Sequence, residues 1–387
     1  MIHTDAWILH TGPEGVPPEA RPPGNLCRGR HSFAAPGDGE ALVEPLYGSW
    51  EANIEHALSR RPIDVCHLRH EEAVVLGNLG IVRVLDPKGS SSLKEGDICM
   101  VMPFAERDRY GYAELIYAYD APRTIGLLAK RTKIATDLLL PIPGNSAYSL
   151  PQWAAYARYF TAWDNWRVAH QCWSTQMPEQ DPGEHLVFGW GGGVVLAELQ
   201  LAKRAGFRVA MTAGSDGRLA ELTRLGITAV DRRLFPHLAL DPEHPPLDAE
   251  EMARYRASEK EFLRTIGALS DGAGAAIFVD NIGAPLYKAT IKAMARQGVV
   301  TTVGWKHGMR TFHLRASECI NRHLHVNTHV WRYDDCATIR DHQENTAWMP
   351  SIDPAAVYEF DKVGQLAADY SSGKVDSYFP LYSVNPL

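Results

Sequence analysis

Residues Glu184–Arg233, EHLVFGWGGGVVLAELQLAKRAGFRVAMTAGSDGRLAELTRLGITAVDRR, carry the pattern that decides the fold. The short run His185–Phe188 is typical of a buried parallel strand, and four glycines follow it within the next five positions. The segment after the glycines has the apolar spacing of a helix and ends in the cations Lys203 and Arg204. Phe207–Thr212 is apolar again and predicts a second strand. This order of strand, glycine turn, helix and strand lets backbone N–H groups and a helix N-terminus receive a pyrophosphate.

The glycine cluster predicts the loop that binds the phosphates of a dinucleotide. Its expected members are Gly189, Gly191, Gly192, Gly193 and Val194. Because glycine clusters also form ordinary tight turns, the end of the second strand supplies a second line of evidence. There, Gly214, Ser215 and Arg218 suit the 2′-phosphate of NADPH, whereas Asp216 could instead hold the ribose hydroxyls of NADH. NADPH is the favoured cofactor, and NADH remains the alternative.

Length and composition describe an ordinary globular protein with room for two domains. The chain has 387 residues, of which 45% are hydrophobic and 22% charged. The net charge of −7 is spread along the chain, which argues against a nucleic-acid-binding surface. No run reaches the roughly 18 apolar residues of a membrane-spanning helix, and Asp5 interrupts the apolar start, so we expect no signal peptide. We therefore expect a cytoplasmic protein whose six cysteines, which lack CxxC spacing, are reduced.

Six motifs, in the same order along the chain, resemble the medium-chain dehydrogenase/reductase superfamily. They are Leu76–Gly80 (LGNLG), Ser92–Asp97 (SLKEGD), Gly111–Glu114 (GYAE), Thr161–Trp163 (TAW), Val279–Gly283 (VDNIG) and Gly298–Gly304 (GVVTTVG). The resemblance implies an α/β protein with a GroES-like, mostly-β catalytic domain over residues 1–164, completed by 337–387. It implies a Rossmann NADP-binding domain with a doubly wound parallel sheet over residues 165–336. It also places further residues in the cofactor site, namely Thr161, Asn281, Gly283, Gly304 and Trp305.

Val195 departs from the superfamily pattern. It stands where the last glycine of the phosphate loop is expected. That glycine allows a strand and a helix to pack closely. We therefore expect a looser contact between the first strand and its helix, and a changed path of the loop.

The run Cys66–Glu72, CHLRHEE, contains residue types that bind zinc. No second cluster with ligand spacing is found in the sequence, so a solvated charged loop is favoured over a metal site. Zinc-bearing members of the superfamily have a histidine and a glutamate where this chain has Asn78 and Leu79. A further cysteine ligand is expected near Ala157, and the four-cysteine structural lobe is missing. The resemblance therefore implies a zinc-independent branch with no bound metal.

The second half of the chain resembles the crotonyl-CoA carboxylase/reductase branch, which reduces enoyl thioesters with NADPH and in some members traps carbon dioxide. The features are the long segment Phe235–Leu269, the pattern from Gly298 through Trp331 and the ending Ser372–Val375. The resemblance implies that the catalytic residues are Asn53, Glu106 and His313.

Two details qualify the catalytic assignment. His307 competes with His313 for the place of the branch's histidine. The branch has a Phe–Glu pair before its GGxAE stretch, but here Ala105 precedes Glu106. Simple reduction is therefore favoured over carboxylation.

Hydride transfer to such a substrate leaves a negative charge that a zinc-free site must stabilise with hydrogen-bond donors. Thr161, Asn53 and His313 are candidate donors, and His313 or Tyr110 has the chemistry of a general acid. We expect a zinc-independent NADPH-dependent enoyl reductase. The first alternative is a metal-free carbonyl or quinone reductase, or an alcohol dehydrogenase. The second is a non-enzymatic relative that has lost the cofactor.

Four other segments carry expectations. The alternating run His323–Trp331 resembles the edge strand through which the superfamily forms dimers, which predicts a homodimer. The arm before Ala41 is rich in Pro, Gly and Arg and reads as irregular around one strand at residues 7–9. The basic run Lys130–Lys133 is favoured as a solvated face over a contact with a phosphate-bearing substrate. Near the end, Asp353–Tyr370 predicts a helix.

Overall fold

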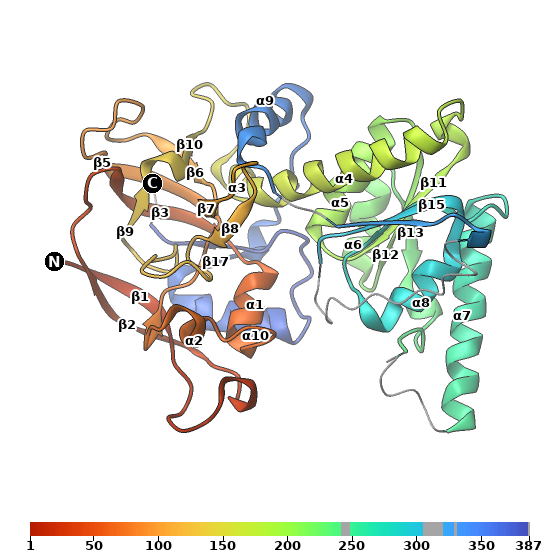
Figure 1. The fold of residues 1–387 in the computed structure, drawn as a ribbon, viewed down its shortest axis with the longest axis horizontal. Coiled ribbons are helices and arrows are strands. Elements are labelled where there is room, and N and C mark those ends of the chain that lie inside the picture. The colour runs from red at the N-terminus through yellow and green to blue at the C-terminus, as the bar shows by residue number, and fades with distance from the viewer. Residues whose placement is uncertain (241–247, 305–319, 329–330, 386–387) are drawn as a thin grey trace. The chain divides into compact units, whose positions relative to one another are not determined.

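The computed structural model describes residues 1–240, 248–304, 320–328 and 331–385. By backbone contacts the chain divides into two compact units, residues 1–160 with 331–387 and residues 161–330 (Figure 1). The helix α4 (Tyr156–Gln176) carries the chain from the first unit into the second.

The second unit is built on a parallel sheet. Its elements are β11 (Leu186–Trp190), α5 (Gly193–Arg204), β12 (Arg208–Ala213), α6 (Asp216–Arg224), β13 (Thr228–Asp231), α7 (Ala249–Leu269), β14 (Ala275–Asp280), α8 (Ala284–Ala293), β15 (Met294–Thr302) and β16 (His325–Thr328). The six described strands follow the order β13-β12-β11-β14-β15-β16, and every pairing is parallel. The chain winds outward from β11 in one direction and from β14 in the other, which makes the sheet doubly wound. This part of the fold prediction is confirmed.

Helices cover both faces of this sheet. On one face, aromatic rings of Phe188 and Phe278 pack with Phe262 of α7, and residues of α8 join the same cluster. Side chains alternate along a strand, so Gly189 and Thr301 point to the opposite face. There they meet α5 and α4 respectively. The short apolar strand β11 is buried at all of its positions, as expected for a strand between two helical layers.

The first unit is mostly β. Its strands are β1 (Ile2–His10), β2 (Leu26–Phe33), β3 (Glu40–Ser49), β4 (Ala73–Val74), β5 (Gly80–Asp86), β6 (Ile98–Val101), β7 (Phe104–Arg107), β8 (Ala113–Ile116), β9 (Thr132–Ala135), β10 (Leu139–Pro141), β17 (Val357–Glu359) and β18 (Leu381–Ser383). Its helices are α1 (Ala52–Ser59), α2 (Val65–Arg69), α3 (Leu150–Ala154), α9 (Cys336–Thr346) and α10 (Val363–Ser371). The main sheet has the order β10-β6-β5-β3-β18-β17, with β9 paired to β3, and only β17 and β18 run parallel in it. The predicted mixed α/β class is confirmed.

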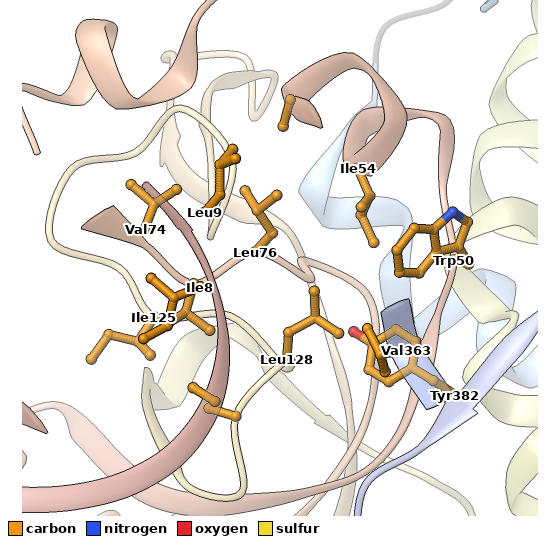
Figure 2. Packing of buried hydrophobic residues seen from close by; sticks show 14 of the residues in the cluster. Ile8, Leu9, Trp50, Ile54, Val74, Leu76, Ile125, Leu128, Val363 and Tyr382 are labelled. Carbon is orange, nitrogen blue, oxygen red and sulfur yellow. The ribbon is translucent and has the colours of Figure 1, made fainter. Parts of the chain in front are cut away.

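The core of the first unit joins its two ends. Trp50 follows β3, and its ring meets the edge of Tyr382 from β18 at a centroid distance of 6.3 Å. Figure 2 shows both rings beside Ile54, Val363 and Leu128. The segment from residue 331 onward is therefore part of this core and not a tail.

The N-terminal arm is more regular than expected. β1 and β2 form an antiparallel pair from Ile2 opposite Phe33 to Leu9 opposite Leu26. Trp7 supports this arrangement, because its indole N–H donates to the carbonyl of Phe360 at 2.8 Å. The Pro- and Gly-rich stretch is only the connection between the two strands.

The expectation of a solvated charged loop at Cys66–Glu72 is only partly right. His67, Leu68, His70 and Glu72 are exposed, but Cys66 and Arg69 are buried and the segment is partly helical. Val65–Arg69 forms a short helix, α2, and the carboxylate of Asp64 caps it by accepting from the backbone N–H of Cys66 at 3.1 Å. Arg60 and Arg21 both pair with Asp64, at 3.1 and 3.0 Å. Capping and these ion pairs therefore hold one side of the segment, with Cys66 and Arg69, inside the protein, while its other side faces solvent.

The helix predicted over Asp353–Tyr370 is also wrong in its first half. Val357–Glu359 forms β17 instead, paired in parallel with β18. Tertiary pairing decides this, because Val357 and Tyr358 also suit a strand. The helix α10 occupies only the second half.

The basic run Lys130–Lys133 is only partly a solvated face. Thr132 is fully buried, and Lys133 pairs with Glu40 at 2.9 Å. The ammonium group of Lys130 donates to the carbonyl of Val384 and lies 4.7 Å from the ring centre of Phe360. Two of these cations therefore bind the chain itself.

No helix among the described residues is long and apolar enough to cross a membrane.

Candidate functional site

Several of the predicted cofactor residues of the second unit lie at one edge of its sheet. The glycine loop follows β11, Ser215 follows β12, Asn281 follows β14 and Gly304 follows β15. These four strands are neighbours in the sheet and run parallel, so their carboxyl ends share an edge. The strand order reverses between β11 and β14, which is where open α/β sheets bind ligands.

The structure shows how Val195 is accommodated between β11 and α5. Its side chain is fully buried and lies over Gly189 and Gly191. A Cβ atom added to Gly189 would come within 2.5 Å of one Val195 methyl group, and one added to Gly191 within 2.6 Å of the other. The valine therefore fits because both strand-side glycines leave room, and the helix stays packed on the strand.

The open side of this loop is at Gly192. A Cβ atom there would meet nothing within 4 Å, and no side chain caps the first turn of α5, which begins at Gly193. The unpaired N–H groups of a first helical turn bind phosphate oxygens readily. These features fit the phosphates of a dinucleotide.

Asn281 joins the loops after β14 and β15. Its side-chain oxygen accepts from the backbone N–H groups of Val303 at 3.0 Å and Gly304 at 3.3 Å. Its own backbone N–H donates to the carbonyl of Trp190 at 3.2 Å. Gly304 must lack a side chain, because a Cβ atom would overlap the Asn281 carbonyl and lie 2.7 Å from its Cα. Asn281 thus holds the site's backbone together.

Asp280, which was not predicted as a site residue, holds the loop that follows β14. One carboxylate oxygen accepts from the N–H groups of Ile282 and Gly283, both at 3.0 Å, and the other accepts from the hydroxyl of Thr290 at 2.6 Å. Burial raises the pKa of Asp280, while these hydrogen bonds act against the rise. An acidic residue at the end of an apolar strand was the available signal.

A second missed residue is Glu198, which is fully buried in α5. Both of its oxygens lie 2.9 Å from the amide nitrogen of Asn165 in α4. The oxygen of Asn165 accepts from the hydroxyl of Thr301 at 2.7 Å. Burial raises the pKa of Glu198 well above its usual range, which favours the protonated form. The signal was an acid on the apolar face of the helix, three positions after Val195.

The end of β12 carries the residues that would choose between the two dinucleotides. Ser215 caps α6, and its hydroxyl accepts from the backbone N–H of Arg218 at 3.4 Å. Asp216 forms an ion pair with Arg233 at 2.6 Å. The acid that would serve the ribose of NADH is thus already engaged.

The catalytic candidates of the first unit lie on separate elements. Asn53 is half-buried on α1, and Glu106 is exposed on β7. No hydrogen bond joins the two within the described ranges. Tyr110, in the turn after β7, is 57% exposed. Among the described residues, Asn53, Glu106 and Tyr110 therefore do not form one hydrogen-bonded group.

The turn that precedes α1 is firmly held. Arg158 of α4 donates to the Glu51 carboxylate at 2.6 Å, to the Tyr378 carbonyl at 2.6 Å and to the Trp50 carbonyl. The position of Asn53 at the start of α1 therefore depends on a buried arginine that the sequence analysis did not single out.

The remaining predicted residues lie either in α4 or outside the described residues. Thr161 is buried in α4, in the second unit. Trp305, His307 and His313 lie outside the described residues. In that part of the chain which is described, no group of three or more His, Cys, Asp or Glu side chains could hold a metal ion.

Asn78 stands where zinc-bearing relatives place a histidine. It is 2% exposed, and its amide nitrogen has no hydrogen-bond partner among the residues described. Buried polar groups without partners are uncommon, so this N–H pair is a candidate donor to a substrate.

Comparison with solved structures identifies the fold. The crotonyl-CoA carboxylase/reductase AntE bound to NADP superposes with a TM-score of 0.74 at 19% identity, covering 99% of this chain and 95% of that one. The chain has the medium-chain dehydrogenase/reductase fold. The 2-octenoyl-CoA carboxylase reductase CinF, bound to NADP and 2-octenoyl-CoA, gives 0.76 at 17% identity, covering 98% and 87%.

An NAD-dependent alcohol dehydrogenase has the same fold, with a TM-score of 0.72 at 19% identity, covering 98% of this chain and 100% of that one. No protein-family model matches the chain, and no curated protein matches its sequence. The fold predicted from the motifs is confirmed, while these identities are too low to transfer an activity.

Proposed function

We propose that this protein is an NADP(H)-dependent oxidoreductase that reduces an activated carbon–carbon double bond, with enoyl thioesters as the substrate class. The observation that carries the proposal is the glycine loop at the strand-order reversal, beside a β12 end whose acid, Asp216, is paired with Arg233. The fold is shared with proteins solved with NADP and an enoyl thioester, which supports this substrate class.

The second unit would bind the cofactor through its backbone. Gly192 and the first turn of α5 would hold the pyrophosphate, and Ser215 and Arg218 the 2′-phosphate. Asn281 and Gly283 would shape the wall next to Gly304, where the nicotinamide half belongs. When bound, NADPH supplies the hydride.

The groups that would act on the substrate are hydrogen-bond donors and a proton donor. Asn53, Thr161 and His313 are the proposed donors to the negative oxygen that forms, and the buried amide of Asn78 is a further donor. We assign proton delivery to His313 and leave Glu106 as a residue of the substrate cleft. We propose a zinc-independent reaction, since neither Asn78 nor Leu79 is a usual zinc ligand.

We also propose a cytoplasmic homodimer. β16 lies at one end of the described sheet and is paired there only with β15, which leaves a sheet edge for a second copy. Pairing of the two β16 edges across a two-fold axis would continue the sheet.

Titration of the purified protein with NADPH and NADH tests the proposal, followed by turnover of crotonyl-CoA with and without bicarbonate. We expect tighter binding of NADPH, enoyl thioester reduction and no dependence on bicarbonate. Binding of neither nucleotide would contradict the proposal and favour a non-enzymatic relative.

The second candidate function is a metal-free alcohol dehydrogenase or a carbonyl or quinone reductase. The alcohol dehydrogenase among the proteins of the same fold favours it. Turnover of ketones, quinones or alcohols, with none of enoyl thioesters, would decide for this alternative.

A further inference from the structure

Arg232 lies against the end of β12. It follows β13, whose last residue, Asp231, is opposite Ala213 in the parallel register, so Arg232 comes beside Gly214. A Cβ atom added to Gly214 would overlap the Nε atom of Arg232 and lie 2.7 Å from Cζ and 2.8 Å from Nη2. The guanidinium group is therefore placed directly over the glycine.

The acidic side chains near Arg232 pair with its neighbour and not with Arg232 itself. Its neighbour Arg233 takes both nearby acids, Asp216 at 2.6 Å and Asp231 at 2.8 Å. Within the described residues the side chain of Arg232 has neither a hydrogen-bond partner nor an ion-pair partner. An exposed cation without an ion-pair partner among the described residues thus lies at the predicted cofactor edge of the sheet.

The position of Arg232 near the end of β12 indicates which part of the cofactor it would contact. The residues at the end of the second strand of a dinucleotide fold contact the adenosine ribose, where only NADPH carries a phosphate. A guanidinium group suits phosphate because it offers a planar set of donors. Pairing with Arg233 partly offsets the negative charge of Asp216, which would otherwise repel that phosphate more strongly.

We propose that Arg232 binds the 2′-phosphate of NADPH and is the main determinant of the preference for NADPH over NADH. Gly214 is required for this role because it leaves the space that the guanidinium group fills. The proposal rests on the proposed function, since it assigns a residue to that cofactor site.

The test is the affinity of Arg232→Gln for NADPH and NADH, measured by nicotinamide fluorescence, with 2′,5′-ADP and 5′-AMP as competitors. We expect about tenfold or greater loss for NADPH and 2′,5′-ADP, which carry the phosphate, and less than about twofold change for NADH and 5′-AMP. The matched control is Arg208→Gln, the same charge change at the opposite end of β12, where Arg208 pairs with Asp271. It should change none of the four affinities by more than about twofold.

A second variant distinguishes the loss of a phosphate contact from a folding defect in Arg232→Gln. Gly214→Ala keeps a backbone conformation open to alanine and displaces only the Arg232 side chain, so it should reproduce the selective loss. Equal losses for NADPH and NADH in both variants, or no loss in either, would overturn the assignment of Arg232 while leaving NADPH binding by the wild type intact. If the wild-type protein bound neither nucleotide, the proposed function itself would fail and the assignment with it.

Discussion

Glu198 shows how one side chain can make the stability of the second unit depend on pH. It has no exposed surface, and its nearest polar partner is a neutral amide, Asn165. No cation among the described residues pairs with its carboxylate, so ionisation inside the protein is opposed by burial. The protonated side chain keeps the link from α5 through Asn165 to Thr301.

Replacing Glu198 by glutamine should flatten the pH dependence of unfolding. In the folded state the pKa of Glu198 is raised, so its stabilising contribution is complete below the unfolded value of about 4.3 and falls as pH rises toward the folded pKa. At pH 8 Glu198→Gln should be more stable than the wild type by on the order of 1 kcal/mol, and the difference should vanish near pH 4. Urea unfolding at pH 4, 6 and 8 measures this. Parallel curves for the two proteins would show that Glu198 does not titrate as argued.

The contact between β11 and α5 is the element-scale feature that shapes the glycine loop. It combines a bulky residue on the helix, Val195, with missing side chains on the strand, at Gly189 and Gly191. The usual arrangement of this loop puts a glycine on the helix instead. Here the small and large positions are exchanged, and close packing is retained.

A double-mutant cycle tests this exchange. Gly189→Ala should cost about 1–3 kcal/mol of stability because its new methyl group overlaps Val195, whereas a second change, Val195→Ala, should recover much of that loss. Gly189 is chosen because its backbone is not left-handed, unlike that of Gly191 with φ +150°. Thermal and urea unfolding of the two single variants and the double variant give the coupling. Additive effects would mean that the two side chains do not share one space.

At the scale of the whole molecule, the edge strand β16 predicts how two copies associate. Its Val326 is 36% exposed on a strand that has only β15 beside it in the described sheet. In a two-fold pairing of β16 edges, the residues of one strand face their counterparts in the other. Val326→Lys would then set like charges close together.

We expect Val326→Lys to be a monomer and Val326→Thr, the matched control, to remain a dimer, as measured by light scattering after size-exclusion chromatography. The melting temperature at low protein concentration should be similar for both, because the side chain is outside the core. A dimeric Val326→Lys protein would place the interface elsewhere, and a monomeric wild type would contradict the proposed dimer.

Sequence patterns predicted the parts of the site that consist of backbone. The apolar run of β11, the glycines after it and the spacing of α5 are local features, and local features determine both the turn and the helix. The same reasoning misplaced β17 and α2. β17 owes its structure to its partner strand β18. The cap of α2, Asp64, and its i,i+4 partner Arg60 are local features, whereas the pairing of Asp64 with Arg21 joins distant parts of the chain.

The sequence by itself determined the doubly wound sheet and the position of the glycine loop, because hydrophobic periodicity and glycine placement act over a few residues. Only the tertiary structure decided which charges meet. It set Arg232 over Gly214, gave Asp216 to Arg233 and enclosed Glu198 against Asn165. These pairs are distant in the chain, so their contacts depend on the register of parallel strands and on helix packing across the sheet.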